Sequence, residues 1–341
     1  MECRIFTDPS NGATYDELLE SAKLAEQFGY GGFFLSDHYM PFAGGGQPGP
    51  TDVWTTLAGL ARETSRIRLG SLVTSATFRH PGPLAIVVAQ VDAMSQGRIE
   101  FGIGAGYFEP EHLAYGIPFP SVAERFDRLA EALELITGLW RSPSGQRYTF
   151  TGKCYQLLNS PALPKPWQSP GPPIMIGGTG KKRTPALAAR FADEFNLQTS
   201  RRRAPQEHLR SELKSEDVAD QIQLVRAAAE AIGRDPAEIA FSMSALVGVG
   251  RTSGQVAAAL DPNYFSSQTF DGTTLSGSPA QIVDQLGALT WNWESRGCMS
   301  ARPRVSKRWR ATSSFSPPTY YPSSRPSECA AVRRRRHNDH H

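Results

Sequence analysis

This sequence of 341 residues holds only four cysteines, which leaves few residues for a cysteine-ligated metal site or a set of disulfides. They form no CxxC pair and no Cys/His spacing typical of a metal site. Neither a zinc site nor a disulfide framework is therefore expected. We expect the thiols to stay reduced, as they do in a cytoplasmic protein. The four are Cys3, Cys154, Cys298 and Cys329.

Long apolar runs are also missing. No stretch approaches the roughly 18 apolar residues that a membrane-spanning helix requires. The first residues lack the basic-then-apolar pattern of a secretory signal. These absences argue against a membrane partner and favour a cytoplasmic location.

Charge of one sign is concentrated at one end of the chain. Residues 289–341 hold 11 of the 36 Lys and Arg residues but only 3 of the 33 Asp and Glu residues. The preceding part is therefore mildly acidic, although the whole chain carries a formal charge of +3. A basic tail on an acidic body does not indicate a nucleic-acid partner.

Short apolar strands alternate with amphipathic helices along residues 1–289. This alternation predicts a parallel sheet, and the length allows an α/β fold of the (β/α)8 TIM-barrel class. The predicted strands are residues 3–7, 32–36, 67–73, the start of 98–109, 174–176, 194–197 and 239–249. The predicted helices are residues 15–28, 53–63, 83–94, 121–140, 184–191, 217–232 and 278–289.

Three segments depart from the alternation. Residues 141–172 read as an insertion that contains a hairpin at 148–157. Residues 199–215 are polar and basic, which predicts an exposed loop. From residue 290 the chain is rich in Trp, Ser, Arg and Pro without periodicity, which is typical of disorder. We therefore predict a barrel domain at 1–289 and a disordered tail at 290–341, with the eighth strand and helix missing.

The tail has a second explanation in its codons. The codons of residues 290–294 are nearly fixed by the genetic code. When the same bases are read in a shifted frame that starts at the third base of the Thr290 codon, they must encode Leu, Val or Met followed by Glu-Leu-Gly. Permitted codons continue that frame as Val-Ala-Arg-Val-Tyr-Val, a helix end followed by a buried strand. We hypothesise a frameshift near residue 289. The alternative is a genuine disordered tail, and resequencing the gene distinguishes the two.

Polar or glycine-rich segments follow four of the predicted strands. Asp37 and His38 end the second strand, and a histidine there suits general acid–base chemistry. Hydroxyl side chains at 74–75 end the third strand, while glycines at 102–106 and 177–180 follow the fourth and fifth. Because a barrel brings the carboxyl ends of its strands to one face, these segments predict a single pocket.

Each segment also has an ordinary structural explanation. Asp37 and His38 could be a cap and a surface histidine. The GxGxG at 102–106 is not a dinucleotide fingerprint, and the carboxylates that follow, at 109 and 111, could lie in a solvated loop. The glycines at 177–180 precede three cations, which favours a phosphate site, but a flexible loop has the same composition.

As a set, these segments resemble the luciferase-like monooxygenase superfamily, in particular its branch that uses the deazaflavin coenzyme F420. The resemblance covers about residues 1–289, apart from 199–215. It implies a (β/α)8 barrel with a flavin-type ring at the carboxyl face and hydride transfer to or from a small organic substrate. The motifs that carry it are Ser36-Asp37-His38 and residues 70–81, 102–107 and 173–178.

The resemblance also implies roles for individual residues. His38, beside Asp37, would be the catalytic acid or base. Glu109 is a weaker catalytic candidate, because some relatives have a Glu directly after the glycine that matches Gly106, where this chain has Tyr107. A non-prolyl cis peptide is implied between Leu72 and Val73. The implied cofactor contacts are Asp37, His38, Leu72, Val73, Ser75, Ala105, Gly106, Gly177, Gly178 and Thr179.

Two other functions are left open by the sequence. One is an FMN-dependent two-component monooxygenase, which would take reduced flavin from a partner reductase. The other is a non-catalytic or unstable product, since a barrel without its eighth strand exposes the edges of strands one and seven. Similar proteins are often homodimers, so a second copy is a further candidate partner.

Overall fold

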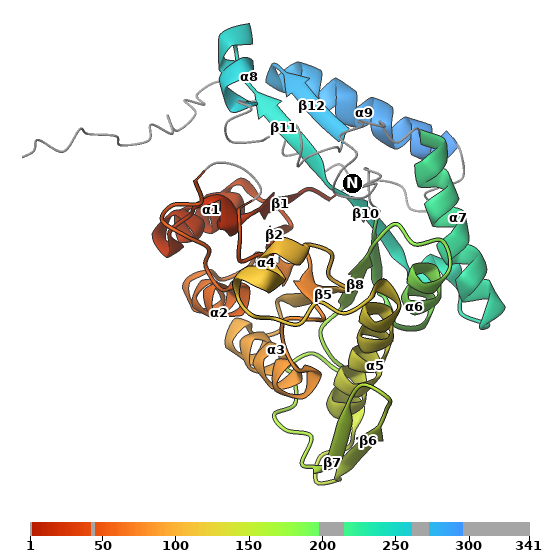
Figure 1. Cartoon of the computed structure of the whole chain (residues 1–341). Helices are drawn as coiled ribbons and strands as arrows, with labels where there is room; N and C mark the ends of the chain where they lie inside the picture. The colour runs from red at the N-terminus through yellow and green to blue at the C-terminus, as the bar shows by residue number, and fades with distance from the viewer. Residues whose placement is uncertain (1, 42–44, 198–214, 261–272, 296–341) are drawn as a thin grey trace, which may run out of the picture. The chain divides into compact units, whose positions relative to one another are not determined.

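The computed structural model of the chain describes residues 2–41, 45–197, 215–260 and 273–295 (Figure 1). All of them lie within one compact unit, Met1–Arg304. Residues 199–214 of the loop predicted at 199–215, and residues 296–341 of the tail predicted at 290–341, lie outside the described residues. In the described parts of the chain, no helix is both long and apolar enough to cross a membrane.

A parallel sheet forms the centre of the described structure. Its strands run in the order β1-β2-β3-β5-β8-β9-β10, and the two-residue strand β4 also pairs with β5. Within the described residues, β1 and β10 are each paired on one side only. The strands are β1 (Arg4–Thr7), β2 (Gly32–Leu35), β3 (Arg68–Ser71), β4 (Thr74–Ser75), β5 (Ile99–Gly104), β8 (Ile174–Gly177), β9 (Glu194–Leu197) and β10 (Ala240–Met243).

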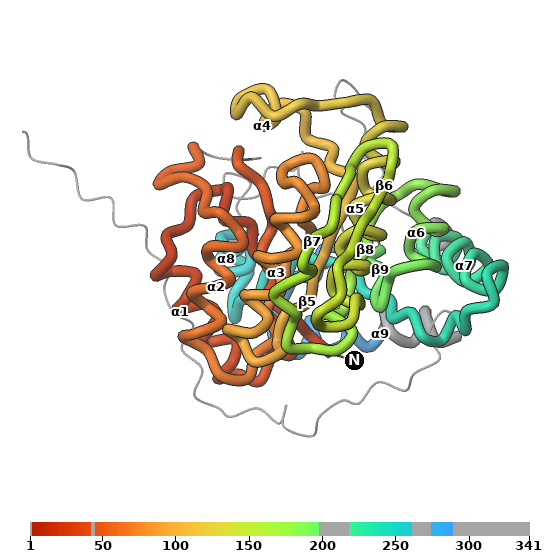
Figure 2. The backbone as a smooth tube through the Cα atoms, turned by 90° about the horizontal axis from the view of Figure 1, so that it is seen from below, coloured from red at the N-terminus to blue at the C-terminus, as the bar shows by residue number. Residues whose placement is uncertain are grey.

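Helices connect successive strands, as the alternation predicts. In Figure 2, α1 to α3 lie along one side of the sheet, and α6 and α7 lie along the other. The apolar core lies between the strands and these helices, with Phe33, Leu57 and Ile136 fully buried. The helices are α1 (Tyr15–Phe28), α2 (Val53–Glu63), α3 (Pro81–Ser95), α5 (Val122–Arg141), α6 (Arg183–Phe191) and α7 (Ser215–Ala231).

Capping explains why the helix ends were predictable. Thr14 and Glu17 form a reciprocal capping box at the start of α1, and Gly29 ends that helix with a left-handed φ of 79°. Asp52 accepts the N–H of Thr55 at 2.8 Å at the start of α2, and Ser121 caps α5. The predicted bounds of α1 and α2 are confirmed.

The prediction of one strand at 239–249 is wrong. The segment forms two strands, because β10 pairs with β9 whereas β11 (Ala245–Val249) pairs with β12 (Thr273–Gly277). Both halves have the apolar, β-branched composition that favours strands. Composition therefore predicts strand throughout and does not mark where the pairing partner changes.

Other elements were missed or misplaced. Two short helices, α4 (Glu109–Ala114) and α8 (Ser253–Ala259), were not predicted, because one or two turns give too few residues for a periodic pattern. Helix α9 (Pro279–Ser295) continues past its predicted end at Leu289. The hairpin of the insertion is confirmed as β6 (Tyr148–Thr151) and β7 (Gln156–Ser160).

Candidate functional site

The centre of the candidate site is a histidine held by a buried carboxylate. His38 follows the carboxyl end of β2, and its Nδ1 lies 3.1 Å from both carboxylate oxygens of Glu111. The Glu111 side chain is 1% exposed and also accepts the N–H of Tyr39 at 3.0 Å. Since the carboxylate accepts hydrogen bonds, Nδ1 carries the proton and Nε2 acts as the acceptor.

Aromatic rings border the other side of this histidine. The Tyr107 hydroxyl lies 3.3 Å from Nε2 of His38. The Tyr107 and Phe108 rings meet the imidazole edge to face, with centroids 5.5 and 6.2 Å away. The histidine therefore stands between a buried carboxylate and a phenol.

Asp37 is oriented differently from its neighbour. Its carboxylate is buried, and both oxygens accept hydrogen bonds from the guanidinium of Arg79. Arg79 also donates to Asp52 and to the hydroxyl of Tyr39, the latter at 2.9 Å. Arg79 is thus an internal ion-pair partner.

Burial and charge act against each other in this cluster. Burial raises the pKa of Asp37, while Arg79 favours its ionised form. The bidentate contact requires a carboxylate, because the guanidinium stays protonated. Burial also opposes ionisation of Asp52, but the N–H of Thr55 and the charge of Arg79 hold its pKa below the ordinary value. Burial, reinforced by Asp37, raises the pKa of Tyr39 to about 12.

The implied cis peptide between Leu72 and Val73 is confirmed. It separates β3 from β4, so the predicted single strand at 67–73 ends earlier than expected. The glycines of β5 make room for this turn. A Cβ at Gly102 would lie 2.0 Å from the carbonyl oxygen of Ser71 and 3.0 Å from a methyl of Val73, and a Cβ at Gly104 would lie 3.0 Å from the other Val73 methyl.

A chain of hydrogen bonds fixes the loop after β5. Ser75 Oγ lies 2.6 Å from Thr77 Oγ1, which lies 2.7 Å from Nε2 of the fully buried His112. The other ring nitrogen of His112 is 2.8 Å from the carbonyl oxygen of Phe108, to which it donates. Gly106 has a φ of 77°, and a Cβ there would lie 2.3 Å from Ser75 Oγ. Ser75 and Gly106, two predicted cofactor contacts, are therefore in direct contact with each other.

The glycine loop after β8 carries features of an anion site. Gly178 has a φ of 147°, and Thr179, Lys181 and Lys182 are exposed. Thr184, in the first turn of α6, is buried, and its Oγ1 has no hydrogen-bond partner among the described residues. A Cβ at Gly180 would lie 2.6 Å from this oxygen, so the hydroxyl lies against the loop.

These features fit a phosphate. A helix N-terminus offers unpaired N–H groups, the two lysines supply positive charge, and the Thr184 hydroxyl supplies a buried donor that needs an acceptor. The sequence pointed to this loop but missed Thr184, because only its burial in the fold distinguishes it from other threonines.

The structure joins some predicted residues through contacts and adds others. Glu111 holds His38, whereas Glu109, the weaker catalytic candidate of the sequence, is exposed at the first residue of α4. Ala105 is half-buried beside Gly106. Sequence reasoning missed Glu111 and His112 as site residues, although both lie just after the glycine segment. The signal available was a second carboxylate, two residues beyond Glu109.

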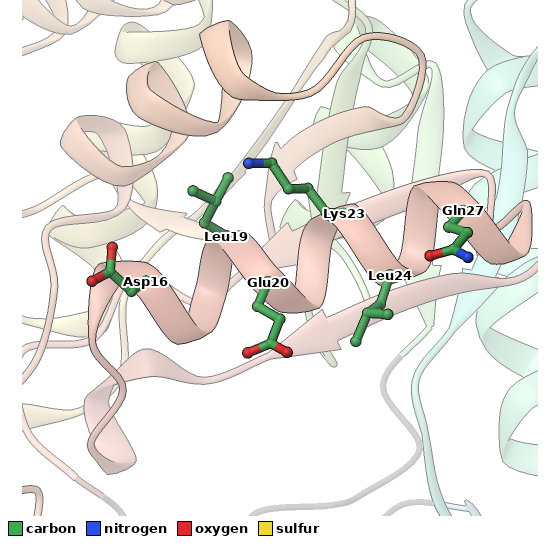
Figure 3. Close-up of a pocket in the computed structure, with 6 residues that line it drawn as sticks. All are labelled: Asp16, Leu19, Glu20, Lys23, Leu24 and Gln27. Atoms are coloured by element: carbon green, nitrogen blue, oxygen red, sulfur yellow. The ribbon is translucent and has the colours of Figure 1, made fainter. Parts of the chain in front are cut away.

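A separate hollow lies on the outer face of α1 (Figure 3). All of its lining residues come from that one helix, and none is a predicted site residue. They are Asp16, Leu19, Glu20, Lys23, Leu24 and Gln27.

The described structure is a parallel β/α sheet with His38 and a glycine loop at the carboxyl ends of two of its strands, the edge at which α/β barrels hold their chemistry. The sequence profile of the family described as Luciferase-like monooxygenase matches residues 1–291. The chain therefore belongs to the luciferase-like monooxygenase family, and the predicted (β/α)8 fold class is confirmed.

Two curated relatives and one solved structure are similar to the chain. An F420-dependent glucose-6-phosphate dehydrogenase of Microbacterium testaceum (strain StLB037) is 37% identical over 182 residues, which are 53% of this chain and 52% of the relative. An F420-dependent hydroxymycolic acid dehydrogenase of Mycobacterium tuberculosis (strain ATCC 25618 / H37Rv) is 32% identical over 252 residues, which are 72% of this chain and 62% of the relative. The chain therefore matches less than two thirds of the length of each of these relatives.

The solved structure is described as an F420-dependent secondary alcohol dehydrogenase in complex with an F420-acetone adduct. It superposes with a TM-score of 0.69 at 20% identity and covers 85% of this chain and 90% of its own. At that identity, the similarity shows the fold alone.

Proposed function

We propose that this chain is a coenzyme F420-dependent oxidoreductase that transfers a hydride between the deazaflavin and a small organic substrate. The observation that carries the proposal is the His38–Glu111 pair at the carboxyl end of β2. It offers a fixed acid–base group where α/β barrels hold their chemistry. The names of the two dehydrogenase relatives support the choice of coenzyme.

The two halves of the site suit the two ends of such a coenzyme. Gly177, Gly178 and Thr179 would hold the phosphate with their backbone N–H groups, and the buried Thr184 hydroxyl would donate to it. The Leu72–Val73 peptide, Ser75, Ala105 and Gly106 would contact the ring. When bound, the deazaflavin supplies the hydride chemistry, and the protein supplies position and proton transfer.

His38 would carry the proton that accompanies the hydride. Its Nδ1–H is held by Glu111, so the carboxylate stabilises the imidazolium that forms when Nε2 takes a proton. Asp37 would not take part in the proton transfer. Its carboxylate is bound to Arg79, so its role would be to hold the backbone next to His38 in place. Glu109 would be a secondary candidate, since it is exposed at the start of α4.

An FMN-dependent two-component monooxygenase is the second candidate, supported by the description of the family. The monooxygenase would need a reductase as a protein partner, whereas the F420-dependent oxidoreductase would need no partner reductase. A homodimer stays a proposal in either case.

Titration with both coenzymes tests the choice. We expect F420 to bind, as measured by the change in its fluorescence, and FMN to bind more weakly. Tight FMN binding with no affinity for F420 would overturn the proposal in favour of the monooxygenase.

Two threonine variants test the phosphate end. Thr184→Val removes the buried hydroxyl and should weaken F420 binding by roughly tenfold, the value of one hydrogen bond to a charged group. Thr137→Val is the matched control, because its buried hydroxyl bonds to the Leu133 carbonyl within α5 at 2.7 Å. Equal affinities of the two variants would contradict a phosphate at this loop.

A further inference from the structure

A row of hydrogen bonds runs from a buried histidine to the end of β4. His112 is fully buried, and its Nδ1 lies 2.8 Å from the carbonyl oxygen of Phe108. Its Nε2 lies 2.7 Å from Thr77 Oγ1, which in turn lies 2.6 Å from Ser75 Oγ. Ser75 is the last residue of β4, so the row ends at the carboxyl edge of the sheet.

The direction of these bonds follows from the inner end of the row. A carbonyl oxygen can only accept, so Nδ1 of His112 carries a proton. The imidazole packs against the rings of Phe78 and Phe119, with centroids 5.0 and 4.7 Å away, and has no carboxylate partner in the part of the chain that the structure describes. A neutral imidazole has a single proton, which leaves Nε2 as an acceptor. The Thr77 hydroxyl therefore donates to Nε2.

This direction also fixes the hydrogen of Ser75. A hydroxyl has one hydrogen, and that of Thr77 is used on His112, so Thr77 Oγ1 accepts from Ser75. Ser75 thereby uses its own hydrogen and keeps only lone pairs. Among the described residues, Thr77 is the bonded partner of the Ser75 hydroxyl, and a Cβ at Gly106 would lie 2.3 Å from the Ser75 oxygen. Because residue 106 has no side chain, it does not cover this oxygen.

We propose that Thr77 and His112 are positioning residues that make Ser75 an obligate hydrogen-bond acceptor, and that Ser75 binds an N–H group of the coenzyme ring. The inference rests on the proposed function, in which Ser75 contacts that ring, and it names the group that is recognised. The pyrimidine part of a deazaflavin or a flavin offers one imide N–H between two carbonyl groups. The carbonyl oxygens need a donor, which Ser75 no longer supplies, so the imide N–H is the group that fits.

The first test needs neither coenzyme nor turnover. In the ¹⁵N spectrum of the labelled protein, with the ring signals linked to the assigned backbone of His112, we expect a protonated Nδ1 and an unprotonated Nε2. An imidazolium, or a proton on Nε2 alone, would reverse the row and overturn the proposal.

Two threonine variants complete this test. Thr77→Val should shift the Nε2 signal of His112, because it removes the hydroxyl that donates to it. Thr137→Val is the matched control and should leave the signal unchanged, because the Thr137 hydroxyl bonds to the Leu133 carbonyl within α5. An unchanged Nε2 signal in Thr77→Val would mean that the row does not exist.

The second test is a binding cycle between Ser75 and the imide N–H. Methylation of the imide nitrogen removes the donor, so the methylated F420 should bind the wild type about tenfold more weakly than F420, the upper value for one neutral hydrogen bond. In Ser75→Ala the two coenzymes should bind within about twofold of each other, because the acceptor is gone. An equal methylation penalty in both proteins would place the N–H elsewhere and overturn the proposal.

A comparison of two Thr77 variants separates positioning from packing. Thr77→Ser keeps the hydroxyl and should retain the F420 affinity of the wild type. Thr77→Val keeps the shape but leaves the Ser75 hydrogen without its acceptor, so F420 affinity should fall by about threefold to tenfold. Equal affinities of the two variants would show that Thr77 does not set the polarity of Ser75.

FMN carries the same imide N–H, which keeps this inference separable from the proposed coenzyme. If FMN binds and F420 does not, the proposed function is wrong. A methylation penalty for FMN that disappears in Ser75→Ala would then still support the role of Ser75, and the lack of such a penalty would overturn it. A wild type that binds neither coenzyme would overturn both.

Discussion

Arg79 holds both carboxylate oxygens of the buried Asp37, a residue 42 positions earlier in the chain. The same guanidinium contacts Asp52, the cap of α2, and the hydroxyl of Tyr39. The strand end that carries His38 is thereby tied to the start of α2 and to the segment before α3. Asp37 supports the site by fixing the backbone next to the histidine.

Removing the guanidinium should be strongly destabilising. Arg79→Gln leaves the Asp37 carboxylate buried without its partner, which costs about 3–5 kcal/mol of unfolding free energy. Urea unfolding measures the loss. The double variant Asp37→Asn/Arg79→Gln should recover part of it, because no buried charge is left. Purely additive losses would show that the two residues are not coupled.

Glu111 should matter more to the reaction than Glu109. Glu111→Gln replaces the acceptor of Nδ1–H and no longer stabilises the imidazolium, so kcat should fall by at least about tenfold. F420 affinity should change little, because Glu111 contacts the histidine and the Tyr39 backbone.

The comparison with Glu109→Gln makes this test specific. Both residues belong to α4, but Glu109 is exposed and Glu111 is buried. The larger loss of kcat should therefore occur at Glu111. A larger loss at Glu109 would instead support the weaker catalytic candidate from the sequence.

The order of strands and helices, the cis peptide and the strand-end segments could be predicted, since all depend on local patterns or on a family motif. Glu111 could not be assigned to His38, because their contact joins residues 73 positions apart. The helix that orients Glu111 is only six residues long, too short for a periodic signal. The split at 239–249 was missed for a related reason, since strand pairing is non-local.

Gly106 is predicted to tolerate no side chain. Gly106→Ala would combine a left-handed φ of 77° with a Cβ 2.3 Å from Ser75 Oγ and 2.9 Å from Thr77 Oγ1. Gly145→Ala is the control for the cost of the left-handed backbone without a steric clash, because Gly145 has a φ of 85° and no atom within 4 Å of its Cβ position.

Thermal unfolding should rank these two variants clearly. Gly145→Ala should lose about 1–2 kcal/mol, the cost of a left-handed residue with a Cβ. Gly106→Ala should lose more and should also weaken F420 binding, since the hydroxyls of Ser75 and Thr77 must move. Equal losses would mean that the contact with Ser75 relaxes without cost.

Glu26 gives a prediction on pH. Its carboxylate accepts backbone N–H groups from Ser65 and Ile67 at 3.0 and 2.9 Å, and also the N–H of Arg66. Burial opposes ionisation, but these hydrogen bonds outweigh it and hold the pKa of Glu26 below its ordinary value. Because the folded-state pKa is lowered, the stabilisation is fully present above the unfolded pKa of about 4.3. It is lost as the pH falls through the folded-state pKa.

Glu26→Gln should therefore lower stability at neutral pH by about 1 kcal/mol, a low value for a charged acceptor because the group is partly exposed. The difference from the wild type should stay constant between about pH 6 and 8 and shrink below about pH 4. Thermal unfolding across this range measures it. The control Glu20→Gln changes an exposed glutamate of the same helix and should stay within about 0.5 kcal/mol of the wild type at every pH. A Glu26→Gln deficit that persists undiminished in acid would show that the loss comes from packing rather than from the carboxylate.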